Sequence, residues 1–217
     1  MRRDRVSGVI LAGGESKRLN GLYKPLLEVG GRPMILYSLE ALRPASDEVL
    51  IVVRGREKAD SLTGVVGSAA RIVVEPDSPP RAPLIGLIEG ARSAEGRTVL
   101  VAPADTPFVT PRVYEILDAE LAGGDADAAV PTWPNGYIEP LVAAYRRREF
   151  LRAAEEVVSR GELRISSVLS LLRVKLVPVG ALSERPEVTF LNVNTLKDLL
   201  LARRMMKDLG GAREVPG

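Results

Sequence analysis

The 217-residue sequence contains no cysteine and no histidine. Their absence excludes disulfides, thiolate or imidazole metal ligands, and mechanisms in which histidine activates a serine or cysteine nucleophile. Chemistry must therefore rest on carboxylates, lysine, arginine, hydroxyl groups and backbone amides. Glutamine is also absent, asparagine occurs four times, and 24 of the 30 cationic residues are arginine. This composition resembles that of heat-adapted proteins.

Long hydrophobic runs are missing as well, since no stretch approaches the ~18 apolar residues of a membrane span. The charged start MRRDRV leads into an apolar segment too short for a secretory signal, so we expect a cytoplasmic protein that does not enter the membrane. The net charge is only +2 and the basic residues are scattered, so nucleic acid is not an expected partner. The length predicts one domain over residues 1–209, followed by a flexible tail at 210–217.

Short runs rich in valine and isoleucine alternate with helical patterns along most of the chain. The predicted strands are Val6–Leu11, Glu48–Val53, Arg71–Glu75, Thr98–Ala102, Ala126–Pro131, Leu141–Tyr145 and Lys175–Val179. The predicted helices are Pro33–Leu42, Arg56–Leu62, Pro83–Ala91, Pro111–Leu121, Arg147–Val158, Ile165–Leu172 and Thr195–Leu209. Several strands are apolar without alternation, as in sheets that helices cover on both faces. The order predicts an α/β fold with a mainly parallel sheet.

The loop after the first predicted strand reads LAGGESKR. Gly13 and Gly14 permit positive φ and close backbone approach, so successive amides could bind an anion, with Lys17, Arg18 and Lys24 adding positive charge. The spacing matches neither a P-loop nor a dinucleotide-binding turn. A simple glycine turn with solvated cations remains an alternative.

A second loop, APADTPF, places Asp105 between apolar neighbours at a strand end. A buried carboxylate requires compensation, and Mg²⁺ usually takes one or two protein carboxylates together with substrate phosphates. A metal ligand and an Asx-turn before Pro107 are both consistent with this position.

A third loop, FLNVNTLKD, carries Asn192 and Asn194. In an extended segment the two side chains project to the same side, about 6.6 Å apart. They could orient phosphate oxygens or metal-bound water without adding negative charge, although paired asparagines before a helix are also common in ordinary loops. The following TLKD resembles a capping box. Three polar features at three strand ends together favour a binding site.

These segments resemble a known family. LAGGESKRLNGLYKPLLEVGGRP resembles the signature of nucleotidyltransferases that act on phosphorylated acceptors. With PLIGLIEGA, PADTPFVTP, IEPLVAAY and FLNVNTLKDL in that order, the chain is similar to the MobA-like molybdenum cofactor guanylyltransferases from Val9 to about Leu200. The resemblance implies a doubly wound, Rossmann-like sheet with one antiparallel strand, which would suit Leu141–Tyr145. It also implies Mg²⁺-dependent joining of GTP to the phosphate of molybdopterin, with release of pyrophosphate.

The resemblance further implies roles for individual residues. Those expected to bind the nucleotide are Leu11, Ala12, Gly13, Gly14, Lys24, Asp77, Pro83 and Gly86. Arg18, Lys24 and Asp105 would be catalytic, Asp105 would also hold Mg²⁺, and Asn192 and Asn194 would face the acceptor. The segment VVRGRE after the second strand lacks the polar amide that some members use, so the resemblance assigns no base contact there.

Such a reaction would not need the missing histidine, because a phosphate monoester is largely dianionic at neutral pH and can attack without a general base. GTP and a phosphorylated pterin would be the partners, and contact with other molybdenum cofactor proteins stays open. Two alternatives remain: transfer of a nucleotide to another phosphorylated cofactor precursor or sugar phosphate, and a non-catalytic nucleotide-binding regulator.

Overall fold

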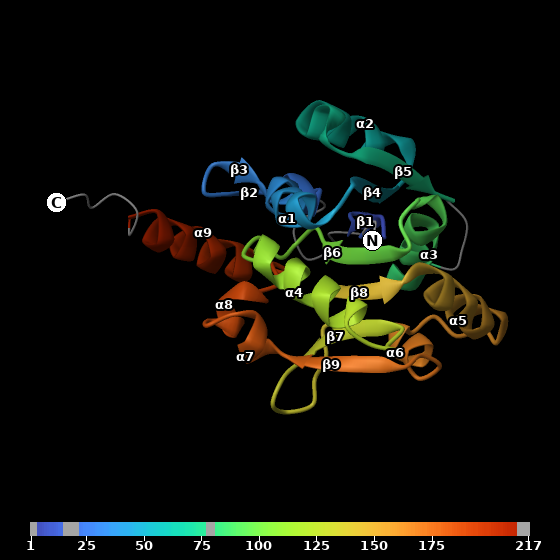
Figure 1. Cartoon of the computed structure of the whole chain (residues 1–217). Helices are drawn as coiled ribbons and strands as arrows, with labels where there is room; N and C mark the ends of the chain where they lie inside the picture. The colour runs from blue at the N-terminus through green and yellow to red at the C-terminus, as the bar shows by residue number, and fades with distance from the viewer. Residues whose placement is uncertain (1–3, 15–21, 77–80, 212–217) are drawn as a thin grey trace.

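The computed structural model describes residues 4–14, 22–76 and 81–211. Its centre is a seven-stranded sheet with the order β5-β4-β1-β6-β8-β7-β9, which runs from top to bottom in Figure 1. The strands are β1 (Val6–Leu11), β4 (Glu48–Arg54), β5 (Arg71–Glu75), β6 (Thr98–Pro103), β7 (Ala128–Thr132), β8 (Ala143–Arg146) and β9 (Val174–Pro178). All seven predicted strands are therefore present, with ends that differ from the predictions by two residues at most.

Helices cover both faces of this sheet. They are α1 (Met34–Leu42), α2 (Arg56–Val66), α3 (Pro83–Ser93), α4 (Pro111–Ala122), α5 (Arg147–Ser159), α6 (Ile165–Leu169), α7 (Val179–Leu182), α8 (Pro186–Thr189) and α9 (Leu196–Gly211). One buried cluster joins α1, α2, α4 and α7 to the sheet, and a second joins α3, α5 and α6 to it. The predicted doubly wound α/β fold is confirmed.

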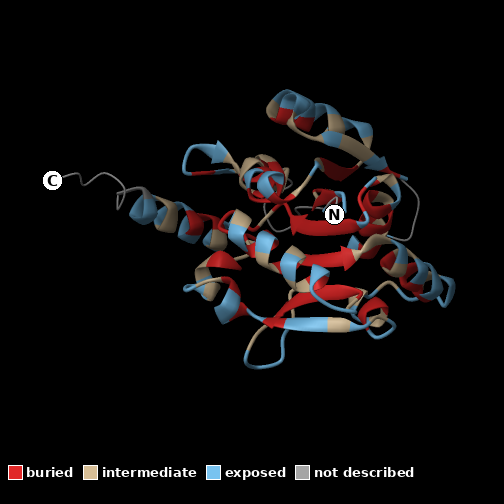
Figure 2. Cartoon of the chain, in the orientation of Figure 1, coloured by how far each residue is buried: buried red, intermediate tan, exposed pale blue. Residues whose placement is uncertain are grey.

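The two buried clusters take alternate residues of the same strands. On β1, Ile10 belongs to the first cluster and Val9 to the second, and both side chains are fully buried. This division follows from the strand period of two residues. Figure 2 shows the central strands as buried, whereas much of the edge strand β9 is exposed. The unbroken apolar runs in the sequence thus correspond to strands covered on both faces.

Within the seven-stranded sheet, β8 is the strand that runs antiparallel to the others, pairing antiparallel with both β6 and β7. The prediction of one antiparallel strand in this region is confirmed, but β8 begins at Ala143, two residues later than expected. Pro140 has no N–H to donate to a ladder, and the N–H of Val142 donates to the carbonyl of Glu139 at 3.1 Å. This turn ends the loop, and β8 begins after it at Ala143.

A short hairpin and the two short helices α7 and α8 were not predicted. The hairpin pairs β2 (Glu28–Val29) with β3 (Arg32–Pro33) through Gly30 and Gly31, whose φ angles are +60° and +74°. Both values are typical of a type I′ turn, which glycine adopts without strain. The hairpin lies against α9, with Val29, Met34 and Leu199 in a third buried cluster.

The predicted capping box at the start of α9 is formed. Asp198 Oδ2 accepts a hydrogen bond from the N–H of Thr195 at 2.8 Å, and the N–H of Asp198 donates to Thr195 Oγ1 at 3.2 Å. Directly before this cap, the N–H of Val193 donates to the carbonyl of Asp105 at 2.9 Å. The last loop is thereby fixed against the end of β6.

Strands β1, β4, β5 and β6 run parallel and end at one edge of the sheet. Because β8 runs the opposite way, the loop that precedes it reaches the same edge. Among the residues that the structure describes, no helix has the length and apolar character needed to cross a membrane.

Candidate active site

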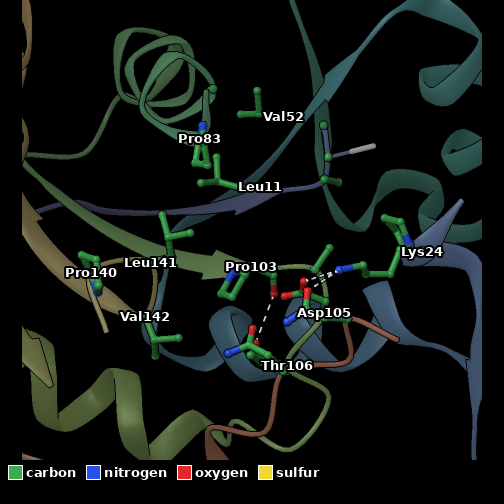
Figure 3. A pocket seen from close by; sticks show the side chains of 18 of the residues that line it. Leu11, Lys24, Val52, Pro83, Pro103, Asp105, Thr106, Pro140, Leu141 and Val142 are labelled. Carbon is green, nitrogen blue, oxygen red and sulfur yellow. Dashed lines mark hydrogen bonds and ion pairs between the residues drawn. The ribbon is translucent and has the colours of Figure 1, made fainter. Parts of the chain in front are cut away.

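A pocket of about 820 Å³ lies at this carboxyl edge. The ends of β1, β4, β5 and β6 form its floor, while the start of α3, the loop before β8 and the loop before α9 form its walls. Figure 3 shows Leu11, Val52 and Pro83 on one side, Pro140 and its neighbours on another, and Lys24 with Asp105 on a third. Loops at this edge of α/β sheets are the usual place for ligands.

Three predicted residues from distant parts of the chain meet in this pocket. Lys24 Nζ donates to Asp105 Oδ2 and to Asn194 Oδ1, each at 2.8 Å. Lys24 begins a short 3-10 turn, Lys24–Leu26, in which Pro25 is buried. Asp105 follows β6, and the Asp105 carbonyl holds the loop that carries Asn194. The lysine thus joins the first, second and third predicted loops.

The carboxylate of Asp105 has an unused oxygen. Its side chain is 20% exposed, and the buried Oδ1 has no hydrogen-bond partner within the described ranges. An unsatisfied carboxylate oxygen is costly to bury and is a suitable ligand for a hard cation. No group of three or more acidic, histidine or cysteine residues suited to a metal occurs in the part of the chain that the structure describes. Asp105 therefore fits a Mg²⁺ site in which substrate oxygens and water complete the coordination.

The glycine loop after β1 lines the opposite part of the pocket through Leu11, Ala12, Gly13 and Gly14. The N–H of Ala12 donates to Val52 at 2.8 Å, which continues the sheet pairing for one more residue. Positive φ angles, one of the two reasons given for Gly13 and Gly14 at the sequence level, do not occur at either residue. Close approach explains Gly13 instead, because a Cβ there would lie 3.0 Å from Glu75 Oε1.

A lysine that sequence reasoning missed holds this loop from outside. Lys58, on α2, donates to the carbonyls of Gly13 and Gly14 at 3.2 and 3.3 Å, and its Nζ lies 5.4 Å from the centre of the Tyr23 ring. The Tyr23 hydroxyl in turn donates to the carbonyl of Ala12 at 2.9 Å. Burial raises the pKa of that hydroxyl. The cation on α2 gave no sequence signal, because exposed helix faces are commonly charged.

Glu75 is a second site residue that was not predicted. It ends β5, lines the pocket and is only 3% exposed. Arg54, at the end of β4, places Nε 2.7 Å from Glu75 Oε1, yet Oε1 accepts no hydrogen bond from the described residues. The contact is therefore an ion pair whose N–H is poorly aligned with the oxygen. A glutamate at the end of an apolar strand run was the sequence signal, the same one that indicated Asp105.

Helix α3 brings Pro83 and Gly86 to the pocket beside Glu75. Pro83 occupies the first turn, where its missing N–H costs nothing. A Cβ on Gly86 would lie 3.1 Å from Glu75 Oε2 and 3.5 Å from Leu11 Cδ2. Glycine at this position therefore keeps space open between the helix, the first loop and the buried carboxylate.

The wall formed by the loop before β8 carries Tyr137 and Glu139. Burial raises the pKa of the Glu139 carboxyl, and a hydrogen bond of 2.9 Å from the Trp133 indole N–H partly offsets this effect. Asn192 lines the pocket from the loop before α9, and its amide donates at 3.4 Å to the carbonyl of Phe190. Both predicted asparagines thus border the pocket.

Most predicted site residues surround this one pocket: Leu11, Ala12, Gly13, Gly14, Lys24, Pro83, Gly86, Asp105, Asn192 and Asn194. Arg18 and Asp77, together with Lys17, lie outside the described residues. The individual roles stay predictions.

Comparison with known proteins agrees with this architecture. Residues 8–175 match the MobA-like NTP transferase domain. A Pyrococcus furiosus protein named "Probable molybdenum cofactor guanylyltransferase" is 34% identical over 206 residues, covering 94% of this chain and 99% of its own length. A Bacillus licheniformis protein of the same name is 34% identical over 194 residues, covering 88% and 93%.

A solved structure is also similar. The crystal structure of molybdopterin-guanine dinucleotide biosynthesis protein A from Archaeoglobus fulgidus superposes with a TM-score of 0.77 at 26% identity, covering 93% of this chain and 99% of that one. The family match includes the glycine loop, Lys24, Glu75, Pro83, Gly86 and Asp105. With most of its length matched by the family and by full-length relatives, this chain belongs to the MobA-like NTP transferase family.

Proposed function

We propose that this protein is a guanylyltransferase that joins the GMP unit of GTP to the terminal phosphate of molybdopterin and releases pyrophosphate. The observation that carries the proposal is the meeting of Lys24, Asp105 and Asn194 between the glycine loop and the loops before β8 and α9. The names of the relatives in Pyrococcus and Bacillus support the choice of substrates.

In the proposed reaction, a phosphate oxygen of the acceptor forms a bond to the α-phosphorus of GTP. The bond from that phosphorus to the oxygen bridging the α- and β-phosphates breaks, and pyrophosphate leaves with the electron pair. No proton needs to be removed from a dianionic phosphate. This agrees with a chain that has no histidine or cysteine.

The protein would contribute mainly position and charge. Lys24, already held by Asp105 and Asn194, would direct its ammonium toward the triphosphate, whose charge grows at the leaving pyrophosphate. The amides of the loop at Gly13 would contact phosphate oxygens from the other side. Bound at Asp105, Mg²⁺ would offset negative charge at the reacting phosphate.

The test is a pyrophosphate-release screen that crosses the four NTPs with molybdopterin and other phosphorylated acceptors, with Mg²⁺ or with EDTA. We expect turnover with GTP, molybdopterin and Mg²⁺ together. Lys24→Ala should lower kcat about 10- to 100-fold, because a charged contact that strengthens in the transition state is lost. Lys197→Ala, an exposed lysine on α9 outside the pocket, is the matched control and should keep wild-type turnover.

The same screen tests the alternatives. Turnover with a different base or acceptor would replace the proposed substrates while keeping nucleotide transfer. Nucleotide binding without turnover for any acceptor would favour a regulator. Unchanged kcat in Lys24→Ala would reduce the role of the lysine to ground-state binding.

A further inference from the structure

We infer that Tyr23 and Lys58 are positioning residues: they hold the glycine loop from outside the pocket, so that the N–H groups of Gly13 and Gly14 face the phosphates of the nucleotide. The inference rests on the proposed function, since those phosphates belong to the nucleotide of the same reaction. Neither Tyr23 nor Lys58 is among the residues that line the pocket. Both would therefore act on the substrate through the loop.

Three successive carbonyl groups of the loop are held by these two side chains. The carbonyl of Ala12 accepts a hydrogen bond from the Tyr23 hydroxyl at 2.9 Å. The carbonyls of Gly13 and Gly14 accept from Lys58 Nζ at 3.2 and 3.3 Å. Because Lys58 Nζ lies 5.4 Å from the centre of the Tyr23 ring, a cation–π interaction joins the two side chains into one group. All three carbonyls are therefore turned toward this group.

The planarity of the peptide bond then fixes the direction of the N–H groups. In a trans peptide the C=O of one residue and the N–H of the next point in opposite directions. With the carbonyls of Ala12 and Gly13 held as described, the N–H groups of Gly13 and Gly14 point away from Tyr23 and Lys58. Both glycines line the pocket, and neither N–H donates a hydrogen bond within the described ranges. Successive N–H groups of this kind form an anion-binding site.

The loop needs such support because its own backbone supplies little. The last backbone hydrogen bond to the sheet is the one from the N–H of Ala12 to Val52, and Gly14, two residues later, is exposed. Glycine has the widest range of backbone angles, so two in succession would otherwise sample many orientations. The contacts with Lys58 restrict the loop before the nucleotide arrives, which lowers the entropic cost of binding.

The positive charge of Lys58 contributes mainly through the peptide units. A hydrogen bond to the carbonyl of Gly13 polarises that peptide and strengthens the N–H of Gly14 as a donor. A phosphate oxygen on that N–H would lie roughly 8 Å from Lys58 Nζ, across one peptide unit. This separation is about one Debye length at physiological ionic strength. Orientation should therefore outweigh direct attraction, and the effect of Lys58 should persist at high salt.

Titration of GTP and of inorganic tripolyphosphate into the protein, with Mg²⁺ and without acceptor, tests the inference. Lys58→Met keeps the length of the side chain and removes its donors. We expect this variant to bind both ligands about 10-fold more weakly, as for part of the contribution of hydrogen bonds to a charged group. Tyr23→Phe removes one neutral hydrogen bond and should weaken both by about 3- to 10-fold. Equal factors for the two ligands would place the effect on the phosphates.

Rescue and a kinetic comparison separate positioning from a general loss of structure. Lys58→Arg keeps donors for the two carbonyls and should bind GTP within about threefold of the wild type. Lys207→Met, at an exposed position on α9 outside the pocket, is the matched control and should bind both ligands normally. With acceptor present, Lys58→Met should raise KM for GTP and leave kcat within about threefold, because the amides hold the phosphates before and during transfer.

The inference is overturned if folded Lys58→Met and Tyr23→Phe bind tripolyphosphate as tightly as the wild type. It is also overturned if the Lys58→Met difference disappears between about 0.1 and about 0.5 M KCl, since direct attraction would then explain it. The proposed function fails separately, when the variants weaken phosphate binding as expected but the wild-type protein releases pyrophosphate with no phosphorylated acceptor.

Discussion

The ion pair between Lys24 and Asp105 can be tested without any substrate. The perturbations are Lys24→Met, which keeps the length of the side chain, Asp105→Asn, which keeps its shape, and the double variant. A double-mutant cycle of unfolding free energies isolates the coupling between the two groups.

The expected coupling follows from distance and exposure. Lys24 Nζ and Asp105 Oδ2 are 2.8 Å apart, and the two side chains are 19% and 20% exposed. Exposed pairs contribute about 0.2–1 kcal/mol, whereas breaking a buried pair costs about 3–5 kcal/mol. A pair with one-fifth exposure should lie between these limits, so we expect a coupling of about 1–3 kcal/mol.

Urea unfolding at pH 7 and low salt measures each variant, and equal m-values would show that the unfolding transition is unchanged. Lys24→Met should cost more in the wild-type protein than in the Asp105→Asn background, because in the wild type it removes the cation that pairs with Asp105 Oδ2 while Oδ1 already lacks a hydrogen-bond partner among the described residues. A coupling below about 0.5 kcal/mol would mean that the pair contributes nothing beyond an ordinary surface contact.

Three further predictions concern stability and pH. Gly90→Ala should destabilise the protein by about 1–3 kcal/mol, because its Cβ would lie 2.5 Å from Val9 Cγ1. Gly64→Ala on α2, where a Cβ would meet no atom within 4 Å, should instead increase the free energy of unfolding by about 0.5–1 kcal/mol. Urea midpoints measure both changes, and a Gly90→Ala variant as stable as the wild type would contradict the close packing of α3 on β1. Hydrogen bonds from Arg173 lower the pKa of Asp127 below its ordinary 3.8. The contribution of the ionised Asp127 to the free energy of unfolding is therefore fully present above about pH 4 and is lost as the pH falls through the lowered pKa. Asp127→Asn should lower the free energy of unfolding by about 1 kcal/mol at pH 7. In urea titrations this difference from the wild type should shrink toward pH 2, and a difference that grew instead would contradict the assignment to Asp127. With a phosphate nucleophile, kcat should rise through about pH 6 and level off above about pH 7; a log-linear rise to pH 9 at saturating substrates would exclude that nucleophile.

Periodicity predicted the strands well because the apolar runs are uninterrupted, and the antiparallel strand came from the family resemblance, since pairing direction leaves no mark in a single run. Helices α7 and α8 have four residues each, too few for a helical repeat to be visible. The hairpin at Gly30 and Gly31 did carry a signal, two glycines between short extended segments.

Site prediction succeeded where a polar residue followed a strand, as for Asp105, and failed where it lay within one. Glu75 was counted as the last residue of a predicted strand, although it lies at the carboxyl edge of the sheet as Asp105 does. The contact of Lys58 with the glycine loop depends on how α2 lies beside that loop. Only a three-dimensional structure supplies that information.

The cluster formed by Lys24, Asp105 and Asn194 cannot be completed until late in synthesis of the chain. Its three members lie near the beginning, the middle and the end of the sequence, and the loop with Asn194 is held by the carbonyl of Asp105. A chain still on the ribosome can pair β1 with β4 and β6 long before it contains Asn194. The lysine would then have Asp105 beside it but not Asn194. The cluster is therefore complete only when synthesis has passed Asn194.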